Sequence, residues 1–195
     1  MTDSGRSGVL RTGERTPWDG RREPWDRMCA VPTVLRATAD HPDIARFVTA
    51  LLEEMAERYD DDPDTIERTD EAAAFVLLLD DDGTPLGSGA VQRLSKSKPD
   101  AAVDHGEIKR VYVVPEARGR GLSRLLMTEL VELARELGYT YLQLETGDVQ
   151  PEAIGLYESS GWTRVPNYGQ YESDPRSLCF GLRINITPTR DVSDL

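Results

Sequence analysis

A glycine-rich segment between a β-type run and an apolar helical pattern is the part of the sequence best suited to chemistry. The β-type run ends at Pro115, and the helical pattern begins a few residues later. A loop of this kind gathers successive backbone N–H groups, the positive end of a helix dipole and two guanidinium groups around one point. We therefore predict that the loop binds a pyrophosphate group. Its residues are Arg118, Gly119, Arg120, Gly121, Leu122 and Ser123.

Two other glycine-loop motifs do not fit this segment. A Walker loop requires a lysine after its last glycine, and none follows Gly121. A dinucleotide fingerprint requires a third glycine at the position that Arg124 occupies. The remaining alternative is an ordinary turn from strand to helix with its arginines in solvent, which six residues alone do not exclude.

A second segment, from Leu144 to Trp162, favours the pyrophosphate loop over the ordinary turn. The two segments have the order and separation of a known pair of motifs. Together the two segments resemble the GNAT family of acetyl-CoA-dependent N-acetyltransferases. The family's motifs are Gln/Arg-x-x-Gly-x-Gly/Ala and Asn-x-x-Ala-x-x-x-Tyr-x-x-x-Gly-Phe. In the second motif Ala153, Tyr157 and Gly161 match, and the departures from the two motifs are Ser123 for Gly or Ala, Gln150 for Asn and Trp162 for Phe.

The resemblance implies direct transfer of an acetyl group from acetyl-CoA to an amine, without a metal. An amine with a pKa of about 10 must lose a proton before it attacks, and the departing thiolate benefits from a proton donor. Glu107 matches the glutamate that serves as base in some members; its alternative is a strand-end carboxylate paired with Lys109 or Arg110. Tyr157 matches the tyrosine that serves as acid, and its alternative is an aromatic residue that only packs.

The resemblance also implies how the cofactor lies. The backbone of Val111, Tyr112 and Val113 is expected to pair with the pantetheine arm, on a strand that splays from its neighbour. One N–H group of this strand would then polarise the thioester carbonyl. We also expect Gln150 to contact the cofactor.

The acceptor is the least defined partner. The resemblance places it near residues 167–171 and 60–64, where Tyr168 and Tyr171 either sandwich the substrate or anchor a loop. A small-molecule amine is favoured over a protein amine. From another class, a non-catalytic domain that binds acyl-CoA for regulation is the alternative, and the presence of Glu107 and Tyr157 counts against it.

Composition excludes several classes of partner. A net charge of −12 and a pI near 4.6 argue against nucleic acid and anionic membranes, and favour cationic substrates only weakly. No apolar run approaches the roughly 20 residues that span a bilayer. Cys29 and Cys179 form neither a disulfide framework nor a metal-ligand pattern, and His41 and His105 are isolated. With no hydrophobic segment near Met1, these features predict a cytoplasmic protein.

Three regions follow from composition and periodicity. Residues 32–187 form the predicted acetyltransferase domain, and residues 188–195 form a tail. Residues 1–31 are rich in Gly, Ser, Arg and Pro and read as an extension. Trp18 and Trp25 leave two interpretations open: either the extension is a disordered leader, or it packs on the domain or on a second subunit of a homodimer.

Periodicity also predicts the elements that position the candidate site residues. Their order implies an α/β fold of the GNAT type, a mixed central sheet of six to seven strands with helices on both faces. An Asp-Asp-Gly turn at residues 81–83 joins two of the strands as a hairpin. Strands are expected at residues 34–37, 75–79, 86–92, 107–114, 141–146 and 178–186, and helices at residues 44–59, 122–137 and 151–159.

Overall fold

The computed structural model describes residues 31–60, 73–94, 98 and 101–185. The predicted C-terminal tail, nearly all of the predicted N-terminal extension and residues 61–64 lie outside these ranges. Among the helices of the described ranges, none combines the length and the apolar character needed to cross a membrane.

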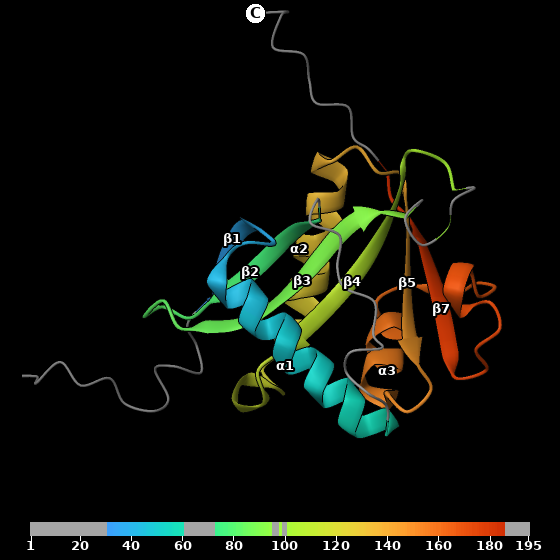
Figure 1. Cartoon of the computed structure of the whole chain (residues 1–195). Coiled ribbons are helices and arrows are strands. Elements are labelled where there is room, and N and C mark those ends of the chain that lie inside the picture. The colour runs from blue at the N-terminus through green and yellow to red at the C-terminus, as the bar shows by residue number, and fades with distance from the viewer. Residues whose placement is uncertain (1–30, 61–72, 95–97, 99–100, 186–195) are drawn as a thin grey trace, which may run out of the picture. The chain divides into compact units, whose positions relative to one another are not determined.

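Seven strands form one mixed sheet, in the order β1-β2-β3-β4-β5-β7-β6 (Figure 1). All neighbours are antiparallel except β4 and β5, which are parallel. The sequence predicted this mixed sheet and six of its strands. It missed β6, because two exposed residues show no periodicity. The strands are β1 (Thr33–Thr38), β2 (Ala74–Leu79), β3 (Pro85–Arg93), β4 (His105–Val113), β5 (Tyr141–Gly147), β6 (Thr163–Arg164) and β7 (Ser177–Arg183).

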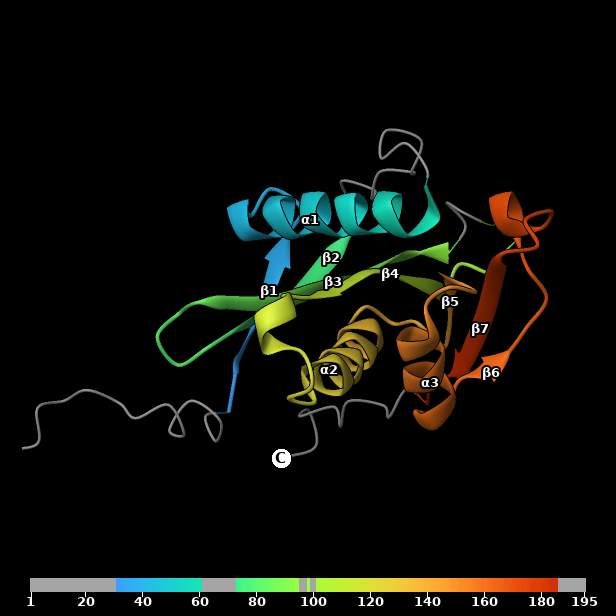
Figure 2. The same ribbon diagram turned by 90° about the horizontal axis from the view of Figure 1, so that it is seen from below.

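Three α-helices cover the sheet, with α1 (Pro42–Tyr59) on one face and α2 (Leu122–Glu136) and α3 (Pro151–Ser159) on the other (Figure 2). All three were predicted to within a few residues. Apolar side chains at helical spacing bury each helix against the sheet, and each large one adds roughly 1.5–3 kcal/mol to stability. Two short 3-10 helices, η4 (Pro115–Ala117) and η5 (Gly169–Tyr171), were not predicted.

A bulge in β4 changes the course of that strand. Ala90 of β3 faces Lys109 and Ser88 faces Tyr112, so Gly89 alone stands opposite the two residues between them. A side chain at Gly89 would bring its Cβ within 2.6 Å of the side chain of Leu130 in α2, so the helix packs directly on this backbone. A bulge bends the strand that carries it.

The bend lies where β4 leaves β5. These two strands pair only between residues 105–107 and 141–143, and beyond Glu107 they diverge. The predicted splay of the fourth strand is therefore present, and it opens a wedge in the middle of the sheet.

Candidate active site

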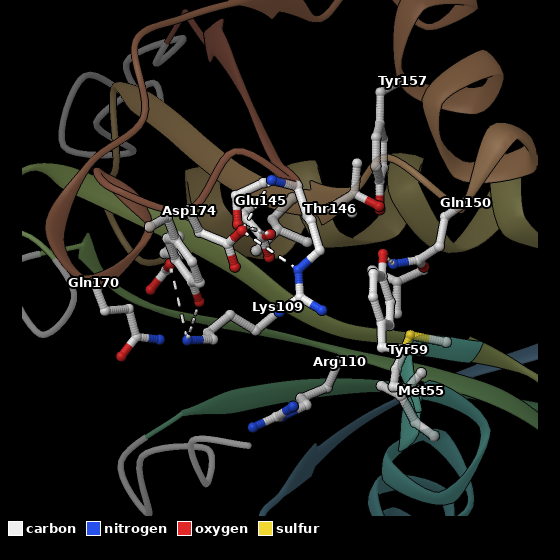
Figure 3. A pocket seen from close by; sticks show the side chains of 18 residues that line it. Met55, Tyr59, Lys109, Arg110, Glu145, Thr146, Gln150, Tyr157, Gln170 and Asp174 are labelled. Atoms are coloured by element: carbon white, nitrogen blue, oxygen red, sulfur yellow. Dashed lines mark hydrogen bonds and ion pairs between the residues drawn. The ribbon is translucent and has the colours of Figure 1, made fainter. Parts of the chain in front are cut away.

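Two adjoining hollows open at this wedge. The first, here named the strand cavity, has a volume of about 470 Å³ and lies between the diverging ends of β4 and β5 (Figure 3). The second, here named the loop groove, has a volume of about 700 Å³ and runs along the glycine-rich loop to the start of α3. The two hollows share five lining residues, namely Leu51, Met55, Val111, Gln150 and Tyr157.

The loop groove brings together most of the predicted cofactor residues. Gly121 is the N-cap of α2 and has a φ of 78°, a backbone that glycine adopts without steric cost. Leu122 instead packs into the apolar core, and Arg120 is exposed outside the groove. The predicted residues that line the groove are Val111, Tyr112, Val113, Arg118, Gly119, Gly121, Ser123 and Gln150.

Arg118 is held at the groove by a carboxylate from α1. Its Nη2 lies 2.5 Å from Oε2 of Glu54, and its Nε donates to the carbonyl of Val113 at 2.9 Å. Arg58 also donates to Glu54, at 2.7 Å, and pairs with Glu152 of α3. Burial opposes ionisation of Glu54, but hydrogen bonds from Arg118 and Arg58 outweigh it and lower the pKa of this carboxyl. Two guanidinium groups beside the loop thus already hold one negative charge.

Glu107 lies at the floor of the strand cavity and is 1 % exposed. Its Oε2 accepts from Nε2 of Gln92 at 2.9 Å, and its Oε1 accepts from the hydroxyl of Tyr168 at 2.8 Å. Lys109 lies 3.9 Å from the same Oε1. Tyr168, a predicted acceptor contact, is only 3 % exposed and is not one of the described residues that line either hollow. Burial, and after it the charge of Glu107, raises the pKa of the Tyr168 hydroxyl.

Of the other predicted acceptor contacts, some line the strand cavity and some do not. Tyr171 lines the strand cavity, and its hydroxyl accepts from Nζ of Lys109 at 3.2 Å. Asp60, by contrast, is the left-handed C-cap of α1 and is not among the described lining residues.

Glu145 lines the strand cavity, although it was not predicted from the sequence as a candidate. It projects from β5 into the strand cavity, and its Oε1 accepts from the hydroxyl of Ser177 at 2.7 Å. Burial raises the pKa of this carboxyl, although the bond from Ser177 acts in the opposite direction. One signal was present in the sequence: a carboxylate inside an expected strand, directly after the apolar Leu144. A perturbed carboxyl in a cavity is typical of functional sites.

Tyr157 lies at the junction of the two hollows. It is 6 % exposed on α3, and its ring packs 5.6 Å from that of Phe180 and 6.2 Å from that of Trp162. Burial raises the pKa of its hydroxyl, so the phenol stays protonated and can donate. Thr146 lies next to it (Figure 3), 4 % exposed, and among the described residues its hydroxyl oxygen has no hydrogen-bond partner. The junction therefore offers a proton donor and an unused hydroxyl.

Comparison with known proteins identifies relatives of this arrangement. The model of the acetyltransferase (GNAT) family matches residues 43–162. An IAA acetyltransferase from Azospirillum brasilense is 38% identical over 96 residues, which are 49% of this chain and 59% of that protein. The uncharacterized N-acetyltransferase YjgM of Escherichia coli is 33% identical over 88 residues, which are 45% of this chain and 50% of that protein. The chain thus spans about half the length of these curated relatives.

Solved structures show the same fold. A protein classed as an acyl-CoA N-acyltransferase from Klebsiella pneumoniae has a TM-score of 0.63 and 25% identity, covering 78% of this chain and 97% of its own. A phosphinothricin acetyltransferase from Sinorhizobium meliloti in complex with AcCoA has a TM-score of 0.54 and 19% identity, covering 84% and 96%. The second likeness concerns the fold alone.

Proposed function

We propose that this chain, which belongs to the GNAT acetyltransferase family, transfers the acetyl group of acetyl-CoA directly to an amine. Its family membership follows because the family model matches more than half of the chain. The observation that carries the proposal is the position of Tyr157, a buried phenol that lines both the loop groove and the strand cavity. With the thioester at this junction, the rest of acetyl-CoA would lie in the loop groove and the acceptor would lie in the strand cavity. Screening amines with acetyl-CoA while free thiol is measured tests the activity.

The cofactor is proposed to lie along the loop groove. Amides at the start of α2, together with Arg118, would bind the pyrophosphate. The edge of β4 from Val111 to Val113 is left unpaired by β5 beyond the wedge, so its backbone can pair with the pantetheine arm. An N–H group of this edge would then polarise the thioester carbonyl.

Transfer needs two proton movements. The amine nitrogen attacks the carbonyl carbon, the carbon–sulfur bond breaks, and Tyr157 gives its proton to the departing thiolate. The proton of the ammonium goes to a carboxylate of the strand cavity. Glu145 is the base we favour, because both oxygens of Glu107 already accept hydrogen bonds in a nearly sealed position. Glu107 is the alternative base.

Replacement of Glu145 by glutamine should lower kcat/KM about tenfold, since Glu107 and water remain to accept protons. In the parent, activity should fall as the pH drops through the pKa of Glu145. Burial raises that pKa, so the acidic limb should lie above the ordinary glutamate value of about 4.3. Profiles of kcat/KM against pH check this: the limb should vanish in Glu145→Gln and persist in Glu107→Gln. The reverse pattern would assign the base to Glu107.

Replacement of Glu54 by glutamine should tighten acetyl-CoA binding about threefold to tenfold. Glu54 holds Arg118 and Arg58 and would repel a pyrophosphate that approaches the same groove. Calorimetric titration with acetyl-CoA measures the change, and its size should shrink at high salt. Glu57→Gln removes an equal charge from the exposed side of the same helix and should leave affinity unchanged. Equal or weaker binding by Glu54→Gln would show that the carboxylate does not compete with the cofactor.

A small-molecule acceptor is proposed ahead of a protein amine. The strand cavity, at about 470 Å³, has the volume of a typical small-molecule site. A homodimer and a cytoplasmic location remain proposals from the sequence. Tight binding of acetyl-CoA without turnover of any amine would favour the non-catalytic alternative.

A further inference from the structure

The charges that line the strand cavity differ from those of the whole chain. The protein carries a net charge of −12, yet its strand cavity is lined by cations as well as carboxylates. An acceptor with a positive charge alone would match only half of this lining. The cations are Lys109, Arg110 and Arg176, and the carboxylates are Glu107, Glu145 and Asp174.

Neighbouring groups contact Lys109 and Arg176. Lys109 contacts the Tyr171 hydroxyl and lies near Glu107. Arg176 pairs with Asp174 at 3.5 Å, and its guanidinium stacks over the ring of Tyr59 at 5.4 Å. Both side chains are thus oriented at the cavity by neighbouring groups.

Arg110 reaches the cavity through an unusual backbone. Only two non-glycine residues of the described ranges have a positive φ: Asp60, which caps a helix, and Arg110, at 57°. Ile108 and Val111 both pack on the same apolar cluster, although residues three apart in a regular strand point to opposite faces. The bulge therefore removes Arg110 from the regular alternation of side chains between the two faces of the strand. A glycine would adopt this backbone at no steric cost, whereas the arginine carries a conformational penalty here.

The cavity has two chemically different sides. Lys109 and Arg110 lie on one side in Figure 3, and Tyr157 and Thr146 lie on the other. Thr146 presents a buried hydroxyl, without a hydrogen-bond partner in the described part of the chain, on the side where transfer is proposed, and Glu145 lines the same cavity. A molecule with an amine at one end and an anion at the other would satisfy both sides.

We propose that the acceptor carries a carboxylate as well as its amine, as an α-amino acid does, and that Arg110 binds this carboxylate with Lys109 beside it. A guanidinium can hold a carboxylate through two parallel hydrogen bonds, which fixes orientation as well as charge. The amine then faces Glu145, Thr146 and the thioester. This inference rests on the proposed acetyl transfer and names its substrate class.

Matched acceptors test the inference. For several side chains, the free L-amino acid is compared with its carboxamide and with the amine that lacks the carboxyl group, for example leucine, leucinamide and 3-methylbutylamine. A short peptide with a free N-terminus represents protein amines. The readout is kcat/KM from thiol release, with the N-acetyl product identified by mass spectrometry. We expect the amino acid to exceed its carboxamide and its amine by about tenfold or more, the value of a charged hydrogen bond.

Two variants separate recognition from a structural role. Arg110→Gln and Arg110→Gly should both reduce the ratio of amino acid to carboxamide turnover toward one, mainly through a higher KM for the amino acid. Arg110→Gly should also melt at the parent temperature or above it, because glycine removes the backbone penalty. Arg135→Gln deletes a half-buried cation of α2 that pairs with Glu132 outside both hollows, and it should leave the ratio as in the parent.

The outcomes are distinct. Equal or better use of carboxamides, simple amines or the peptide would overturn the inference while leaving acetyl transfer in place. So would an Arg110→Gly variant that keeps the parent ratio. Binding of acetyl-CoA with no acetylated product from any acceptor would overturn the proposed function itself, and the inference with it.

Discussion

Valine in place of Gly121 should weaken acetyl-CoA binding by about 100-fold or more. Gly121 is the left-handed N-cap of α2 and lines the loop groove together with Ser123, so α2 begins beside this groove. A Cβ placed at Gly121 has no atom within 4 Å beyond its chain neighbours, so it meets no steric clash with the rest of the protein. A β-branched residue nevertheless costs roughly 1–2 kcal/mol in a left-handed backbone and would occupy the space where we propose that the pyrophosphate binds. Calorimetric titration measures the loss.

Gly138→Val is the matched control. Gly138 follows the other end of α2 with a φ of 84°, also meets no atom within 4 Å and lies outside both hollows. It should carry a similar backbone penalty, visible as a lower melting temperature, with parent affinity for acetyl-CoA. If the two valine variants bound acetyl-CoA equally well, the glycine-rich loop would not be the pyrophosphate site.

Phenylalanine in place of Tyr157 should lower kcat by about 10²-fold or more, with little change in acetyl-CoA affinity or melting temperature. The substitution keeps the ring, and so keeps its packing on Phe180 and Trp162, while it deletes the one atom that can donate to the thiolate. Because burial raises the pKa of Tyr157, the parent should keep its donor through neutral pH and lose it only well into the alkaline range. Steady-state kinetics, titration and thermal melting together measure the three quantities.

Tyr141→Phe provides the comparison for this variant. Tyr141 is a half-buried tyrosine of β5 and, unlike Tyr157, lines neither hollow. Its replacement should leave kcat unchanged. A near-normal kcat in Tyr157→Phe would make Tyr157 a packing residue, whereas parallel losses of stability and activity would point to its structural contacts instead of proton donation.

Local patterns in the sequence were enough to predict most of the fold. The helix at 122–137 follows from apolar spacing and a glycine at its end, and α3 from a proline at its start. The glycine-rich loop could be recognised because its six residues are contiguous. These features depend on neighbours along the chain, which a single sequence displays directly.

Long-range contacts of the site could not be predicted in the same way. Nothing near Tyr168 in the chain indicates that its hydroxyl bonds Glu107, 61 positions away. Glu54 lies on a helix among other charged residues, so its pairing with Arg118 has no local signal. The bulge at Arg110 depends on the pairing of β3 with β4, and a strand that simply alternated would have placed this arginine elsewhere.

Whole-chain charge was a poor guide to the acceptor. An excess of Asp and Glu weakly favoured a cationic substrate, but the cavity itself mixes both signs. The excess negative charge therefore lies mainly outside the strand cavity, where it contributes to solubility. Local charge at a concave site decides what binds there more directly than net charge does.

We propose that the thioester of acetyl-CoA lies beside Tyr157 and gives its acetyl group to an amine. The most direct test of this proposal is a reaction of the protein with acetyl-CoA and the matched acceptors, in which free thiol and N-acetylated product are counted in the same sample. We expect one acetylated amine for each thiol released, with both falling about 10²-fold in Tyr157→Phe and remaining at the parent level in Tyr141→Phe. Thiol release without an acetylated amine, or equal product from parent and Tyr157→Phe, would contradict the account.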